Sequence, residues 1–301
     1  CTHPRLKILR LSNNEIKKVP DYISGLKSLQ ELDLSYNPLK QLSPQLAGMK
    51  SLCRVNFRRC RLYESPLSLS HVSQVKNLNI AGNFYLRLPD KLQQFAQLQF
   101  LDISENDLKE LPITISQLKQ LQVLKAQRNQ LKVLPSFIGQ LTQLRELHLQ
   151  ENQIDSLPAT VEKLTQLQVL NLNNNDVRYI PPGFDQLTQL RELRMKKNKL
   201  ARLPAKLGQF TQLERLDMRE SRISVLPKSI GGCVNLRYID LAESRLYTLP
   251  ESIGNLKKLD TLILNQSRIL RLPKAFGGLS NLRYLDLDII RLQDLPASIG
   301  Q

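Results

Sequence analysis

The sequence predicts an α/β solenoid, a curved array of short repeats with a parallel β-sheet on its concave face and short helical or 3-10 turns on its convex face. Two observations predict this fold. A leucine pattern recurs every 23 residues, thirteen times without insertion or deletion, and covers nearly all of the 301 residues. Each copy joins a segment of period two to a segment whose apolar residues lie three apart, which suit a strand and a short turn of helix.

The fixed register indicates one continuous repeat domain over residues 1–301, because each repeat contacts only its neighbours. Solenoids need polar terminal repeats as caps. The first repeat begins at Leu6, after only five residues, and the last stops at Gln301 inside its outer turn, so we expect caps to be missing at both ends. The thirteen repeats begin at Leu6, Leu29, Leu52, Val75, Leu98, Leu121, Leu144, Leu167, Leu190, Leu213, Leu236, Leu259 and Leu282.

Each position of the repeat has a physical role, which the repeat that begins at Leu144 illustrates. Leu144, Leu147 and Leu149 alternate with polar residues, so the leucines point inward. Asn152, at the ninth position, can satisfy backbone groups of the adjacent turn while buried, which predicts a ladder of asparagines along the stack. The fifteenth position is Pro in twelve repeats and Ser43 in the other. Pro has no N–H for a sheet, so it ends the strand side of the coil.

The pattern L-x-x-L-x-L-x-x-N-x-L-x-x-L-P resembles the leucine-rich repeat family, specifically the 23-residue intracellular type found in Ras-group, plant and many bacterial proteins. The resemblance covers essentially the whole chain and implies a horseshoe-shaped scaffold. It identifies no particular activity, because one such scaffold serves many partners.

Repeats three and four depart from the pattern. Cys60 stands at the asparagine position, Ser65 replaces a leucine, and Tyr85 occupies an interior leucine position. Two interpretations remain open: a locally imperfect coil, or a distorted place that receives a partner.

The asparagine ladder is expected to end after Asn198, where the ninth position changes to Ser221, Ser244, Ser267 and Ile290. Serine reaches less far than asparagine and isoleucine forms no hydrogen bond, so we expect the sheet to continue with an altered geometry between coils. An arginine follows each of these residues: Arg222, Arg245, Arg268 and Arg291. The row either pairs with Glu220 and Glu243 or forms a docking strip for an acidic partner.

The net charge of +16 first suggests an anion-binding protein. However, the outward strand positions of all repeats sum to only +1, and most of the excess lies at the second, twelfth and twenty-second positions. These positions fall on flanks and outer turns, where charge keeps a leucine-rich array soluble. A nucleic-acid site would favour a continuous basic track with aromatic platforms, which the register does not produce.

Charged blocks on the expected concave face predict where a protein partner binds. Alternating blocks suit a protein because electrostatics sets its register and association rate. The basic block comprises Arg194, Lys196, Lys197, Lys199, Arg219 and Arg222. The complementary group comprises Phe84, Phe100, Asp102 and Glu105. Phe84 and Phe100 are either one apolar anchor or two separate exposed aromatic residues.

Catalytic and metal chemistry find little support in the sequence. His148 has Glu146 and Glu151 nearby, which is more typical of a surface histidine than of a metal ligand. Cys60 and Cys233 occupy inward positions and are expected to be inert thiols. No nucleophile constellation and no phosphate-binding glycine loop is apparent. The sequence therefore predicts no enzyme, no cofactor, no metal site and no small-molecule substrate.

Three functions remain, in this order. The first is a non-enzymatic protein–protein interaction scaffold that binds its partner on the concave face. The second is a substrate-recruitment domain of a larger enzyme or bacterial effector, with catalysis outside residues 1–301. The third is anionic-surface or nucleic-acid binding through the basic flanks. No apolar run reaches the ~18–20 residues of a membrane span. The absence of cysteine-rich caps disfavours an animal ectodomain and leaves a cytoplasmic or a bacterial secreted or surface location open.

Overall fold

The computed structural model describes residues 3–63, 73–88 and 92–300. The chain divides into two compact units, Cys1–Leu147 and His148–Gln301. A strand occupies the third to fifth positions of every repeat, as the sequence register predicts. These strands are β1 (Ile8–Arg10), β2 (Glu31–Asp33), β3 (Arg54–Asn56), β4 (Asn77–Asn79), β5 (Phe100–Asp102), β6 (Val123–Lys125), β7 (Glu146–His148), β8 (Val169–Asn171), β9 (Glu192–Arg194), β10 (Arg215–Asp217), β11 (Tyr238–Asp240), β12 (Thr261–Ile263) and β13 (Tyr284–Asp286).

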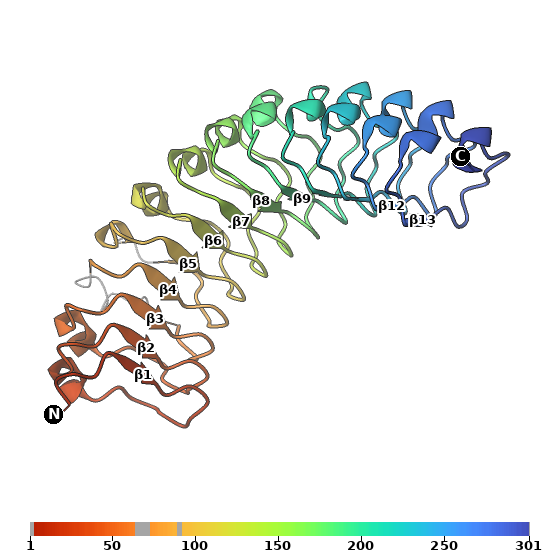
Figure 1. Ribbon diagram of the computed structural model, residues 1–301. Coiled ribbons are helices and arrows are strands. Elements are labelled where there is room, and N and C mark those ends of the chain that lie inside the picture. The colour runs from red at the N-terminus through yellow and green to blue at the C-terminus, as the bar shows by residue number, and fades with distance from the viewer. Residues whose placement is uncertain (1–2, 64–72, 89–91, 301) are drawn as a thin grey trace. The chain divides into compact units, whose positions relative to one another are not determined.

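The strands pair in parallel, and their order follows the chain. In the first unit β1 to β6 lie side by side in sequence, and in the second unit β8 to β13 do the same (Figure 1). Each pairing joins residues one repeat apart, for example Leu9 with Leu32. The predicted solenoid of parallel strands is confirmed.

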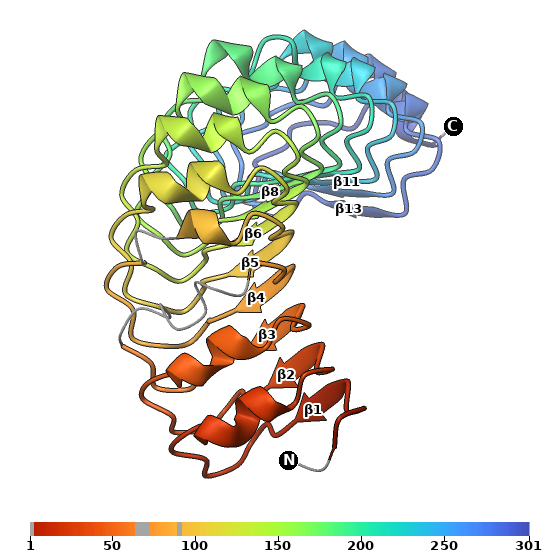
Figure 2. The ribbon, with the colours of Figure 1, turned by 90° about the vertical axis from the view of Figure 1, so that its left-hand side faces the viewer.

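In the coils whose outer segment the structure describes, short 3-10 turns lie on the side away from the strands (Figure 2). Proline pre-sets the extended backbone before most of them: Pro112, for example, has φ −72° and ψ 150°. The turns are η1 (Asp21–Gly25), η2 (Pro44–Gly48), η4 (Leu92–Gln94), η5 (Ile113–Gln117), η6 (Ser136–Gln140), η7 (Ala159–Lys163), η8 (Pro182–Gln186), η9 (Leu207–Gln209), η10 (Lys228–Gly232), η11 (Glu251–Asn255), η12 (Lys274–Gly278) and η13 (Ala297–Gly300). Across the described ranges, no helical segment is long and apolar enough to cross a membrane.

The asparagine ladder forms as predicted and joins each coil to the one before it. The Nδ2 of Asn175 donates to the carbonyls of Leu149 at 2.9 Å and Leu172 at 3.0 Å. Its Oδ1 accepts from the backbone N–H of Ile154 at 3.0 Å. One amide thus satisfies buried backbone groups of two coils, which would otherwise destabilise the fold. The same pattern recurs at Asn37, Asn83, Asn106, Asn129 and Asn198.

Of the serines that end the ladder, the hydroxyls of Ser221 and Ser244 bond within their own coil, whereas the buried hydroxyl of Ser267 has no hydrogen-bond partner among the described residues. Ser221 Oγ accepts from the backbone N–H of Ile223 at 3.4 Å, and Ser244 Oγ accepts from that of Leu246 at the same distance. Strands β10 to β13 nevertheless remain paired. An additional parallel bridge joins Val225 to Thr248 beyond the strands. The sheet therefore continues, as expected, without the amide side-chain bonds between coils that the ladder provides.

Cys60 stands at the asparagine position of repeat three, where it replaces the donor role of the asparagine side chain but not its acceptor role. Its thiol donates to the Leu34 carbonyl at 3.1 Å, but it provides no oxygen that can accept from the preceding coil. Burial is the main cause that raises the pKa of this thiol to about 11, so it stays protonated at neutral pH. The Tyr85 side chain is fully buried nearby, and its hydroxyl has no partner among the described residues. Ser65 lies outside the described residues.

Every repeat places its eighth residue in the left-handed region, with φ between 52° and 65°. Only Gly82 adopts this conformation without strain, and other residues lose about 1–2 kcal/mol there. The conformation turns the chain sharply after the strand, and the asparagine that follows points inward to its backbone partners. The ladder bonds thus stabilise a turn that the local sequence disfavours.

Close packing between neighbouring 3-10 turns in the second unit depends on glycine. A Cβ atom added at Gly254 in η11 would lie 2.1 Å from the carbonyl oxygen of Ala275 in η12. A Cβ at Gly278 would lie 2.5 Å from the Gly254 carbonyl oxygen. Both distances are far below van der Waals contact, so the turns approach closely only because these side chains are absent.

We predict that Asn175→Ala lowers the free energy of unfolding by about 3 kcal/mol, because it leaves one N–H and two carbonyls buried without partners. Chemical denaturation followed by circular dichroism measures the change. Gln189→Ala, an exposed position in the same unit, serves as the control and should change stability by less than about 0.5 kcal/mol. Equal unfolding midpoints for the two variants would contradict the role of the ladder.

We also predict that Gly254→Ala destabilises the fold by about 1–3 kcal/mol, since the added methyl group overlaps the next turn. Gly300→Ala is the matched control, because a Cβ at Gly300 meets no atom within 4 Å. The measurement is the shift in thermal unfolding midpoint. A destabilisation by Gly300→Ala as large as that by Gly254→Ala would show that backbone flexibility, not packing, is responsible.

Candidate functional site

The strand face of the second unit carries a network of ion pairs over β9 to β11. Glu220 lies near both Lys196 and Lys197, with Nζ to Oε distances of 3.8 Å and 3.4 Å. In the next coil Glu243 accepts from the guanidinium of Arg219 at 2.6 Å. This contact is the largest cause of the raised pKa of Arg219. Glu220 and Glu243 both stand at the left-handed eighth position, which presents them beside the cations of the preceding coil.

The remaining cations of the predicted basic block have individual positions. Arg194 pairs with Glu192 on the same strand, and Lys199 pairs with Asp176 of the preceding coil at 2.6 Å. Arg222 is exposed and forms no ion pair with the described residues. The structure therefore brings five of the six predicted residues into contact with carboxylates and leaves Arg222 apart.

The pairing of the arginine row with Glu220 and Glu243 is not formed. Lys196, Lys197 and Arg219 occupy these two glutamates. Within the described ranges, ion pairs are also absent from the side chains of Arg222, Arg245, Arg268 and Arg291, all of which are exposed.

A stacked arginine and two shielded carboxylates adjoin this network and were not predicted. The guanidinium of Arg215 lies 3.7 Å from the centre of the Tyr238 ring. Asp217 and Asp240 face each other on β10 and β11 and are 8% and 5% exposed. Burial raises the pKa of Asp217, and the charge of Asp240 adds to this. Aspartate at the fifth position of two successive repeats was the available sequence signal.

Fifth-position side chains have a structural role that explains this burial. The carboxylate of Asp240 accepts from the backbone N–H of Ala242 two residues later, at 3.0 Å. Asp102 does the same for Ser104 and also accepts from its hydroxyl at 2.6 Å. Asp102 is only 5% exposed, so its carboxylate is occupied within the turn. Such turns are a common use of Asp and Asn after a strand.

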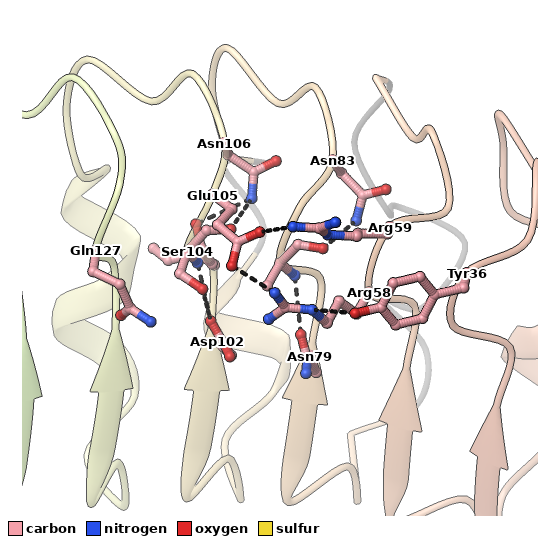
Figure 3. Close-up of polar contacts among 12 residues, drawn as sticks. Tyr36, Arg58, Arg59, Asn79, Asn83, Asp102, Ser104, Glu105, Asn106 and Gln127 are labelled. Atoms are coloured by element: carbon pink, nitrogen blue, oxygen red, sulfur yellow. Dashed lines mark hydrogen bonds and ion pairs between the residues drawn. The ribbon is translucent and has the colours of Figure 1, made fainter. Parts of the chain in front are cut away.

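In the first unit, two arginines of repeat three hold one glutamate of repeat five, an arrangement we call the Glu105 clamp (Figure 3). Arg58 Nη2 lies 2.5 Å from Glu105 Oε1, and Arg59 Nη2 lies 2.7 Å from Oε2. The contact crosses repeat four, which has Ala81 and Gly82 at the corresponding positions. A Cβ at Gly82 would lie 2.5 Å from Cγ of Arg59, so the small residue makes the crossing possible.

Tyr36 completes the clamp on the side of repeat two. Its hydroxyl accepts from Arg58 Nε at 3.4 Å, and its ring centre lies 5.8 Å from the Arg59 guanidinium carbon. Burial lowers the pKa of Arg58, but the contacts with Tyr36 and Glu105 outweigh it and raise that pKa overall. The hydrogen bond from Arg59 is the largest cause that lowers the pKa of Glu105, and Arg58 adds to it. The predicted acidic group is therefore already neutralised within the chain.

The two predicted aromatic residues form no ring pair among the described residues. Phe84 is 56% exposed at the tenth position of repeat four, beyond the strand. Phe100 opens β5, is half-buried, and lies 5.4 Å from the Lys125 ammonium, measured to the ring centre. Phe100 instead borders a hollow of about 270 Å³ on the strand face, together with Glu31, Asp33, Arg54, Asn56, Asn77 and Asn79.

The cysteines and histidines of the described residues assemble no site. No cluster of three or more His, Cys, Asp or Glu side chains suited to a metal ion occurs in that part of the chain. Cys233 is buried, and burial raises its pKa to about 12, which leaves the thiol unreactive at neutral pH.

Comparison with known families agrees with this geometry. A model described as a leucine-rich repeat region matches residues 55–149, 133–226 and 220–301, and a model of two leucine-rich repeats matches residues 4–47. The chain belongs to the leucine-rich repeat family. Proteins with this fold generally serve as protein–protein interaction scaffolds. No curated protein shows significant similarity to the chain.

Solved structures extend the comparison. A leucine-rich repeat protein of Leptospira interrogans, LIC12759, is 30% identical, with 96% of this chain and 80% of that chain covered and a TM-score of 0.84. An internalin, InlF, of Listeria monocytogenes is 23% identical over 93% of this chain and 79% of its own, with a TM-score of 0.81. The ectodomain of the Arabidopsis thaliana receptor kinase GASSHO1/SCHENGEN3 is 24% identical over 97% of this chain and 42% of its own, with a TM-score of 0.71. The last two share the fold alone.

We predict that Glu105→Gln lowers the free energy of unfolding by about 1 kcal/mol at neutral pH. The folded-state pKa of Glu105 lies below its usual value of 4.5, so the clamp stabilises the fold above that value. This contribution disappears as the pH falls through the folded-state pKa, and the variant and the wild type should converge in acid. Denaturation across the acid range tests this. Glu110→Gln, at an exposed position, is the control, and the same pH-dependent gap in that variant would contradict the assignment.

Proposed function

We propose that the chain is a non-enzymatic protein–protein interaction scaffold whose partner binds on the strand face of β9 to β11. The observation that carries this proposal is the ion-pair network of Lys196, Lys197 and Arg219 with Glu220 and Glu243. The network spans three neighbouring coils and holds long charged side chains in one arrangement. Ordering such side chains costs a binding protein about 0.5–1.5 kcal/mol each, and here the fold has already ordered them.

The orientation of Arg215 supports an acidic contact from the partner. Its guanidinium carbon lies 3.7 Å from the centre of the Tyr238 ring, and its side chain is 34% exposed. The Nε atoms of Arg194, Arg215 and Arg219 are shielded from solvent, so an acidic side chain of a partner would accept from the Nη atoms of Arg215.

The balance of charge favours a protein over a nucleic acid. Each cation of the network faces a carboxylate of this chain, so a phosphate backbone would meet repulsion as well as attraction. A protein surface of mixed charge can match both signs, which sets its register and speeds its association. Recruitment of a substrate to a larger enzyme would use the same face and the same kind of contact.

We predict that Lys196→Glu with Lys197→Glu slows association with the physiological partner about tenfold, because the reversal opposes electrostatic steering. The partner is first isolated with the wild-type chain, identified and purified. Association rates of the purified pair are then measured by stopped-flow mixing at several salt concentrations.

The control is Lys27→Glu with Lys50→Glu, which makes the same charge change at exposed positions on the outer flank. It should leave the association rate within about twofold of the wild type. If both double variants slow association equally, binding depends on the overall charge of the chain. If Lys196→Glu with Lys197→Glu leaves the association rate unchanged, the proposed strand-face site is wrong.

A further inference from the structure

We propose that the arginine row formed by Arg222, Arg245, Arg268 and Arg291 is a second binding surface, which takes an extended acidic segment of a protein. The row lies at the tenth repeat position, beyond the strands, and is separate from the strand-face site on β9 to β11. If the proposal for the arginine row fails, the strand-face proposal is unaffected, because the two tests change no residue in common.

Backbone contacts join neighbouring coils of the row. The N–H of Arg268 in repeat twelve donates to the carbonyl of Leu246 in repeat eleven at 2.7 Å, and the N–H of Arg222 joins the row to repeat nine through the Leu200 carbonyl at 2.9 Å. The bridge between Val225 and Thr248 continues this pairing three residues further along. Neighbouring arginines of the row are therefore held one coil apart, about 4.8 Å, which is the spacing of paired strands.

The four guanidinium groups have no compensating charge nearby. All four side chains are exposed, and among the described residues none pairs with a carboxylate. Like charges one coil apart repel one another. The acidic neighbours do not offset this, because Lys196, Lys197 and Arg219 engage Glu220 and Glu243. A row of uncompensated arginines at fixed spacing fits a ligand with repeated anionic groups.

Two exposed apolar side chains beside the middle arginines of the row argue for a peptide. In repeat eleven Arg245 is exposed, Leu246 is buried and Tyr247 is 55% exposed. In the next coil Arg268 and Leu270 show the same alternation, with Leu270 47% exposed. Side chains two apart in an extended segment share a face, so Tyr247 lies beside Arg245 and Leu270 beside Arg268. The corresponding residues after Arg222 and Arg291 are the polar Ser224 and Gln293.

A hollow of about 520 Å³ lies at this place. Arg268 and Arg291 line it with Leu270 and Ile289, so it offers cationic and apolar groups together. Ile289 is 78% exposed although it is β-branched and has a φ of 59°, an unusual conformation for such a residue. An aliphatic side chain of a bound segment would cover both apolar residues, whereas the phosphate backbone of a nucleic acid presents no such group.

The dimensions match an extended peptide. From Arg222 to Arg291 the row covers about 14 Å, while five extended residues cover about 13 Å from first to last. Acidic side chains at alternate positions of such a segment all face the same way, about 6.7 Å apart, within reach of flexible arginines. The proposed ligand therefore has acidic residues at alternate positions with an aliphatic residue nearby.

The test uses the full chain and a fluorescein-labelled peptide of about nine residues with glutamate at alternate positions and one central leucine. Fluorescence anisotropy at physiological ionic strength gives the Kd. We expect Arg245→Gln with Arg268→Gln to weaken binding about tenfold. The matched control is Arg191→Gln with Arg237→Gln, which removes the same charge from exposed flank positions and should change Kd less than about twofold.

A second comparison separates peptide recognition from simple charge attraction. Leu270→Ser should weaken binding of the leucine peptide about threefold and leave a peptide with serine in place of leucine unaffected. Equal losses in the two double arginine variants, or no measurable binding of the peptide to the wild type, would overturn the proposal. It would also fail if single-stranded DNA of equal charge bound as tightly and lost as much affinity in Arg245→Gln with Arg268→Gln.

Discussion

The structure depends on one constraint: after each strand, the backbone must turn inward and leave polar groups in the core of the stack. An amide side chain at the ninth position satisfies these groups in two coils at once, as Asn175 does with Leu149, Leu172 and Ile154. The left-handed residue before it is unfavourable alone and is tolerated because the amide bonds fix the turn. The strands, the parallel pairing and the exposed eighth position all follow from this arrangement.

The same turn determines where charge is displayed. Residues at the eighth position project from a fixed backbone toward the coils that precede them. Glu220 and Glu243 bind cations of the preceding coil there, and Glu105 binds cations two coils away. Charges on the strand face are thus largely paired within the chain. The unpaired arginines at the tenth position stand apart from this pattern, and they begin where serine replaces asparagine. The positively charged side chains therefore lie in three environments. Some are on solvent-exposed flanks, some form ion pairs with carboxylates of the chain, and the arginine row has no carboxylate partner among the described residues.

The period of 23 residues was sufficient to predict the strands, the turns and the ladder, since each depends on residue type at a fixed position. The site was harder to predict, because ion pairs depend on reach and not on period. The clamp joins Arg58 to Glu105 across a whole repeat, and only the small residues Ala81 and Gly82 indicated that this was possible. Asp102 looked like a free carboxylate, although asparagine or aspartate at the fifth position of several repeats already suggested a turn residue. The left-handed eighth position had as its sequence signal only Gly82, Asn13 and Asn174, and the other repeats have residue types that rarely adopt it.

The Glu105 clamp also bears on how an array of this kind can change in length. Most coils of a solenoid contact only their neighbours, so gain or loss of one whole repeat leaves the remaining contacts as they were. The clamp instead spans two coil steps, because one repeat with small residues separates its arginines from its glutamate. Duplication or deletion of that repeat would place Glu105 out of reach or against its own neighbours. A change in repeat number within this stretch of the first unit therefore loses the roughly 1 kcal/mol of the clamp, whereas a change at its flanks does not.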